Sequence, residues 1–356
     1  MKRLAAMILA LCLLLSGCGN WQDGSYVSVK PHEEQFSQND SQLVSASSYS
    51  SLRRALLNMV HNGTQSGVIS VANYNQLTVS RDTRAAIQDI IENDPIGAYA
   101  LESIGFELGT NAGKAAIAVQ ISYHHDRNEM KKIQQVEQMA DARNAMAEAL
   151  DNCDSGIVVY VAQYEETDLI QWVEDYSSLN PDMVMEVPQI TANVYPDSGN
   201  ERILELKFVY KNSRDSLRTM QEQVGILTAA AVEQVNGGEP EKFAGMYSYL
   251  MTQVGEYQLD TSLTPAYSLL INGVGDETAF ASVYAVLCRR AGLECIVVTG
   301  TRSGEPWSWN RICCDGVYYY VDLLRCRENG SFRMYSEREM SGYVGYPASG
   351  MLPEAQ

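Results

Sequence analysis

The residues best suited to nucleophilic catalysis in the C-terminal part of the chain are cysteines, but no histidine lies near them. Five cysteines fall between residues 288 and 326, whereas the four histidines (His32, His61, His124 and His125) all precede residue 126. A cysteine nucleophile is normally activated by a histidine that removes its proton. The cysteines therefore lack their usual general base. Carboxylates such as Glu277 and Asp322 could act as an acid–base pair in its place.

The same cysteines could instead have structural roles. Cys288 lies in an apolar stretch of helical periodicity, which indicates a buried structural thiol. Cys295 and either Cys313 or Cys314 are expected on two strands joined by a short connection, where they could be cross-strand neighbours. Outside the cytoplasm such a pair could form a disulfide. A role as catalytic nucleophile is disfavoured for Cys313 and Cys314, because no histidine lies near them in the sequence. No CxxC pair is present, so we expect neither a zinc cluster nor another metal or cofactor.

Strong local signals predict the elements that carry these residues. The stretch GEPWSWNRICCDGVYYYVD, from Gly304 to Asp322, predicts a β-hairpin because two strand-like runs flank an Asp-Gly pair. A long apolar helix is expected before it, with Asp276 as N-cap and Gly292 just after its end. Another helix is predicted after the Gly-Gly-Glu-Pro break at residues 237–240. Its apolar residues at helical spacing are Phe243, Met246, Tyr247, Leu250 and Val254.

These blocks, in this order, resemble the core of bacterial transglutaminase-like domains. The shared features are the Asn272-Gly273 entry, the long buried helix, an Ala-Gly-Leu motif from Ala291, and the hairpin. They cover about residues 239–322 and imply an α+β domain over residues 239–346 with a papain-like fold. In that family a cysteine at the start of the long helix attacks a glutamine amide or peptide carbonyl. A histidine takes its proton, and an aspartate orients the histidine.

Two of the three catalytic positions of that family are replaced in this chain. Glu277 occupies the position of the nucleophile, Trp307 the position of the base, and Asp322 matches the orienting acid. An indole donates one hydrogen bond and accepts no proton. Both replacements suit the fold, because a helix dipole favours a negative charge in the first turn and an indole fills the space of an imidazole. We expect Asp322 to be structural, bonded to the Trp307 indole or to backbone N–H groups.

The middle of the chain predicts two copies of one α/β unit, at residues 51–138 and 139–235. Gly67 and Gly156 each follow a serine and open similar strands, SGVISVANY and SGIVVYVAQY. A later alternating strand in each copy ends at Tyr123 or Tyr210. Side by side, the copies could form one continuous sheet. The predicted fold class is thus α+β, with two tandem α/β repeat units followed by the transglutaminase-like domain.

The N-terminus has the pattern of an export signal. Two basic residues precede an apolar run from Leu4 to Leu15, which is too short to span a bilayer. The run ends in Leu-Ser-Gly-Cys18, which resembles a bacterial lipobox and implies cleavage before Cys18 and lipidation of its sulfur. The alternative is an ordinary secretory signal. We predict a lipoprotein signal peptide at residues 1–17 and a flexible polar tether at residues 18–50, with the protein lipid-anchored on the outer face of the membrane.

Composition excludes some partners, and three functional readings remain. The formal net charge of −18 argues against nucleic-acid binding. The favoured reading is a non-catalytic lipoprotein whose degenerate domain binds protein, peptide or cell-wall material. The second is a transglutaminase-like or cysteine-peptidase-like enzyme that uses non-standard residues. The third is an assembly component in which the repeats do the binding.

Overall fold

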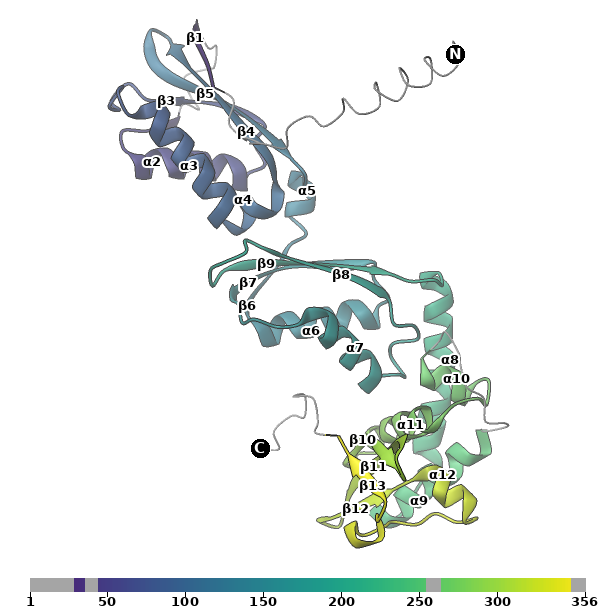
Figure 1. Cartoon of the computed structure of the whole chain (residues 1–356). Coiled ribbons are helices and arrows are strands. Elements are labelled where there is room, and N and C mark those ends of the chain that lie inside the picture. Colours follow the sequence, from purple (N-terminus) through teal and green to yellow (C-terminus); the bar gives the residue numbers. More distant parts are fainter. Residues whose placement is uncertain (1–28, 36–43, 254–263, 347–356) are drawn as a thin grey trace, which may run out of the picture. The chain divides into compact units, whose positions relative to one another are not determined.

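The computed structural model describes residues 29–35, 44–253 and 264–346, and it divides the chain into two compact units (Figure 1). The first unit comprises residues 1–133 and 195–203, and the second comprises residues 134–194 and 204–356. The predicted signal peptide and Cys18 lie outside the described residues. None of the helices in the described part of the chain has the length and apolar character needed to span a bilayer.

The first unit is a five-stranded sheet, in the order β1-β4-β5-β3-β2, with helices packed against it. Helix α2 begins where Ser48 caps the backbone N–H of Ser51, and it buries Leu52, Leu56 and other apolar residues at helical spacing. The elements are β1 (Val29–Gln35), β2 (Val44–Ser45), α2 (Tyr49–His61), β3 (Ser66–Ser70), α3 (Val79–Asn93), α4 (Pro95–Ala100), β4 (Leu101–Asn111), β5 (Lys114–Tyr123) and α5 (Arg127–Met130).

Part of the segment predicted to be a flexible tether forms strands. Strand β1 pairs in parallel with β4, and β2 pairs in parallel with β3. A strand at a sheet edge is held by backbone hydrogen bonds and needs no apolar side chains, which explains how a polar segment joins the sheet. For the other residues of the segment before β2, the tether stays a prediction.

The second unit starts with a four-stranded sheet in the order β6-β7-β9-β8, covered by two helices. Helix α7 is capped by Asp168 and buries Trp172 and Val173. The elements are β6 (Gln134–Gln138), α6 (Met139–Asp151), β7 (Gly156–Gln163), α7 (Leu169–Leu179), β8 (Gln189–Tyr195) and β9 (Arg202–Val209).

The two predicted copies share one order of elements and one order of strands. The first runs β2-α2-β3-α3-β4-β5, with α4 inserted after α3, and the second runs β6-α6-β7-α7-β8-β9. In space the strands follow β4-β5-β3-β2 and β8-β9-β7-β6, and β2–β3 and β6–β7 are both parallel pairs. This agreement supports the duplication, which stays a prediction until the copies are superposed. The expectation of one continuous sheet is wrong, because the copies form separate sheets and β1 occupies the outer side of β4.

The matched tyrosines of the two copies give a test of local energetics. The Tyr123 hydroxyl donates a 2.9 Å hydrogen bond to the carbonyl oxygen of Thr64, whereas the buried Tyr210 hydroxyl has no partner among the described residues. We expect Tyr123→Phe to lower the free energy of unfolding by about 1 kcal/mol and Tyr210→Phe to leave it unchanged or raise it. Urea unfolding of the two variants measures this. Equal changes in the free energy of unfolding for the two variants would contradict the difference in hydrogen bonding between the two hydroxyls.

The Tyr123 hydroxyl should also make the stability of the first unit depend on pH. Burial raises the pKa of Tyr123 to about 12 from its usual value of 10.0, so the folded state favours the protonated hydroxyl. Its stabilising contribution is complete below the unfolded pKa and is lost as the pH rises towards 12. The destabilisation caused by Tyr123→Phe should therefore shrink over that alkaline range.

The C-terminal part of the second unit packs helices against a sheet in the order β12-β11-β10-β13. Every residue of helix α11 from Ala279 to Cys288 is buried, because α9, α10 and the sheet surround it. The elements are α8 (Arg214–Gln234), α9 (Glu239–Gln253), α10 (Pro265–Leu270), α11 (Glu277–Arg290), β10 (Cys295–Arg302), β11 (Glu305–Cys314), β12 (Val317–Val321), α12 (Leu323–Glu328), the short 3₁₀ helix η2 (Glu337–Glu339) and β13 (Tyr343–Gly345).

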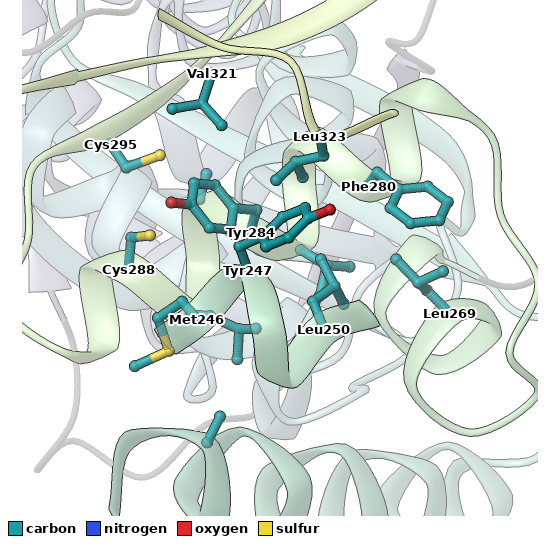
Figure 2. Packing of buried hydrophobic residues seen from close by; sticks show 14 of the residues in the cluster. Met246, Tyr247, Leu250, Leu269, Phe280, Tyr284, Cys288, Cys295, Val321 and Leu323 are labelled. Carbon is teal, nitrogen blue, oxygen red and sulfur yellow. The ribbon is translucent and has the colours of Figure 1, made fainter. Parts of the chain in front are cut away.

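Figure 2 shows the core that fixes α11 in this domain. The ring of Tyr284 lies between α9 and the sheet, and its hydroxyl donates a 3.0 Å hydrogen bond to the carbonyl oxygen of Phe243. From the sheet side, the buried amide of Asn310 donates to the carbonyl oxygen of Ala281 at 2.8 Å. The predicted stripe of α9 is confirmed for its described members, since Phe243, Met246, Tyr247 and Leu250 are all buried; Val254 lies outside the described residues.

Candidate functional site

The N-terminus of α11 forms one side of the candidate site. Asp276 has the extended backbone of an N-cap, and its carboxylate accepts a 2.8 Å hydrogen bond from the backbone N–H of Ala279. Glu277 is the first residue of the helix and is partly exposed. The predicted N-cap is thus confirmed, and Glu277 lies in the first turn, where the helix dipole favours a negative charge.

The hairpin of β11 and β12 forms the other side. Cys314 pairs with Val317 across a two-residue turn in which Asp315 and Gly316 both have positive φ, of 50° and 76°. Such a turn matches the twist of the strands, so the Asp-Gly pair sets the register of the hairpin. That register places Trp307 near the start of β11 and Asp322 directly after β12.

The side chains of Trp307 and Asp322 are in direct contact. The Trp307 indole donates a hydrogen bond of 3.0 Å from its Nε1 to Oδ2 of Asp322. This confirms the partner predicted for Asp322. The indole has no lone pair with which to accept a proton, so it can bond to the aspartate but cannot act as a base.

Asp322 is 1% exposed and is held by further donors besides the indole. Its Oδ2 also accepts a 2.6 Å hydrogen bond from the Tyr343 hydroxyl, and its Oδ1 accepts one of 3.0 Å from the backbone N–H of Arg325, where it caps α12. The Arg302 guanidinium lies 3.6 Å from Oδ2. Each oxygen of the carboxylate therefore accepts at least one hydrogen bond.

Arg302 and Tyr343 enclose this cluster. The Arg302 guanidinium lies 5.0 Å from the centre of the Trp307 ring and 5.8 Å from that of Tyr343, within the range of cation–π attraction. It also pairs with Glu328 at 3.3 Å. Burial and the hydrogen bond to Asp322 raise the pKa of Tyr343, so that its hydroxyl stays a donor at neutral pH.

One contact joins the two sides of the site. The hydroxyl groups of Thr278 on α11 and Ser308 on β11 lie 2.9 Å apart. Thr278 follows Glu277 and Ser308 follows Trp307 in the chain, so the start of α11 packs against the start of β11. The structure therefore brings Trp307 and Asp322 together, and it places Glu277 in the first turn of α11, one residue before the contact with Ser308.

Four cysteines of the domain are buried, namely Cys288, Cys295, Cys314 and Cys326, and Cys313 is partly exposed. Burial raises the pKa of Cys288 well above that of an ordinary thiol, and it also raises the pKa of Cys314 and Cys326. Cys295 pairs across the strands with Ile312, so neither Cys313 nor Cys314 is its direct partner, and all of these thiols are free. The pairing register of β10 and β11 depends on the turn at Ser303 and Gly304, which is why it was not predicted from the sequence. No cluster of three or more potential metal ligands occurs within the described residues.

Comparison with known proteins finds a family match in the C-terminal part of the chain. Residues 228–325 match the family model of the transglutaminase-like superfamily. A search of curated proteins found no match. Among solved structures, similar chains include a transglutaminase (TM-score 0.28, 12% identity, covering 63% of this chain and 69% of that one) and a candidate cysteine protease from Cytophaga hutchinsonii (TM-score 0.26, 12% identity, 45% and 71%). A candidate protease from Parabacteroides distasonis has a TM-score of 0.23 at 10% identity, with 60% and 48% covered.

Proposed function

We propose that the transglutaminase-like domain is a non-catalytic binding module for protein, peptide or cell-wall material, carried by a lipoprotein anchored outside the membrane through Cys18. The observation that carries the proposal is the hydrogen bond from the Trp307 indole to Asp322. In an active domain of this family, a histidine would occupy the position of Trp307, and its imidazole would accept the proton of the catalytic thiol. Here the aspartate orients a group that can take no proton.

The positions of the nucleophile and the acid support the same reading. Glu277 offers a carboxylate at a helix N-terminus, which stabilises the charge of a carboxylate as it would a thiolate but supplies a far weaker nucleophile. A Glu277–Asp322 acid–base pair is disfavoured, because Asp322 is buried and both of its oxygens already accept hydrogen bonds. Loss of a nucleophile and a base together typically lowers the rate of a triad enzyme by many powers of ten.

Thiol reactivity tests this proposal without a known substrate. A catalytic cysteine is a thiolate at neutral pH and is alkylated quickly, whereas buried thiols with raised pKa react slowly. We expect iodoacetamide at neutral pH to alkylate none of the cysteines between residues 153 and 326 faster than free cysteine, as followed by intact mass and peptide mapping. A single residue alkylated more than about tenfold faster would point to a retained nucleophile and refute the proposal.

The anchor has its own test. Changing Cys18 to alanine removes the only sulfur at which the lipobox-like sequence could be lipidated. We expect the variant to lose incorporation of a labelled fatty acid and to leave the membrane fraction or remain unprocessed. Labelling equal to that of the unchanged protein would rule out the anchor.

A further inference from the structure

A cavity lies on the face of the C-terminal sheet that points away from α11. Along β11, Ser308 and Asn310 contact α11, so the alternating residues Trp309 and Arg311 point to the opposite face. There a cavity of about 370 Å³ opens between β10, β11 and the segment from η2 to β13. Its lining includes Trp309, Arg311, Tyr320, Glu337, Tyr343 and Tyr346. This volume suits one small molecule.

Two opposite charges line the cavity without an ion-pair partner. The Arg311 guanidinium is partly buried and lies 5.0 Å from the centre of the Tyr318 ring. Glu337 lies on η2 and also lines the cavity. Within the described residues neither forms an ion pair, with each other or with any further group, whereas Glu339 on the same turn pairs with Arg333. Arg311 and Glu337 are thus available to a ligand that carries both charges.

The rest of the wall is aromatic and includes an unused donor. Trp309 is 3% exposed, and its indole N–H has no acceptor within the described structure. Its ring meets Tyr343 edge to face, with 5.2 Å between the ring centres. Tyr320 and Tyr346 add further rings. Aromatic faces attract ammonium groups and bury apolar side chains.

We propose that this cavity binds a small zwitterion, an amino acid or a short peptide with free ends. Its carboxylate would pair with Arg311, and its ammonium group would lie between Glu337 and the tyrosine rings. A simple anion such as phosphate fits less well because it would meet Glu337, and a simple cation would meet Arg311. The inference gives the proposed binding role a ligand class. It does not depend on whether the triad positions are inert, so ligand binding and thiol reactivity can fail independently.

Isothermal titration of the purified full-length protein tests the proposal with leucine and glycyl-leucine as probes. We expect at least one of them to bind, and its N-acetylated and C-terminally amidated forms to bind at least about tenfold more weakly, because each blocked end removes one charge-assisted contact. Binding of leucine alone would indicate an amino-acid site, and binding of glycyl-leucine would indicate a peptide site. Absence of heat with both probes at millimolar concentration would overturn the proposal.

Variants locate the binding to this cavity. Arg311→Gln and Glu337→Gln should each weaken binding at least about tenfold. Glu337 is exposed on a short 3₁₀ helix, so its replacement should leave the fold intact even if Arg311→Gln does not. Arg338→Gln, an exposed neighbour outside the lining, is the matched control and should bind normally. Equal affinity of Glu337→Gln and the control would contradict the proposed site.

Discussion

Changing Asp322 to alanine is expected to lower the free energy of unfolding of the second unit by about 3 kcal/mol or more. The substitution removes the acceptor of three hydrogen bonds, from Trp307, Tyr343 and the backbone of Arg325, and it takes a carboxylate away from the Arg302 guanidinium. Buried donors left without a partner pay their full cost of desolvation. Asp322 would thus serve to stabilise the fold.

Urea unfolding, followed by circular dichroism, measures this change. Glu328→Ala is the matched control, because Glu328 also pairs with Arg302 but its side chain is 60% exposed, and exposed pairs contribute only about 0–1 kcal/mol. Trp307→Phe should fall between the two, since it removes one donor and keeps most of the apolar ring. A variant Asp322→Ala as stable as Glu328→Ala would show that Asp322 is not structural.

With the proposed alignment, the double change Glu277→Cys and Trp307→His should create an unusually reactive thiol. The helix N-terminus favours a thiolate, and an imidazole in place of the indole could keep the bond to Asp322 while its other nitrogen accepts a proton. We expect iodoacetamide to alkylate the introduced thiol at least about tenfold faster than free cysteine at neutral pH.

Two single variants define the origin of that reactivity. Glu277→Cys alone should react more slowly than the double variant, because the indole offers no base. Thr278→Cys moves the thiol by one residue, to the position that contacts Ser308, and tests the register of the alignment. Equal rates for the double variant and Thr278→Cys would mean that Glu277 is not the position of the nucleophile.

Local signals made the frame of the domain predictable. The Asp-Gly turn of the hairpin, the N-cap at Asp276 and the apolar stripe of α9 each depend on neighbouring residues, and the structure has them where the sequence placed them. The contact between Trp307 and Asp322 could also be predicted, because both residues belong to that hairpin.

Contacts between distant segments were not predictable in the same way. Tyr343 reaches Asp322 from β13, which lies beyond the part of the chain that resembles the family, and no nearby pattern marks it as a partner. Arg302 joins them only because β10 pairs with both β11 and β13. The same pairing creates the cavity around Arg311 and Glu337. Strands β1 and β2 were missed because edge pairing uses the backbone, which a polar sequence does not reveal.

Steady-state incorporation of a fluorescent primary amine into a glutamine-rich protein such as casein, by the purified full-length chain, tests the central claim most directly. The account predicts a rate no higher than that of the same reaction without protein, because Glu277 and Trp307 hold the proposed positions of the nucleophile and the base. Incorporation above that background, abolished by Glu277→Gln or by Cys313→Ser, would contradict it and show that the domain has kept or relocated its chemistry.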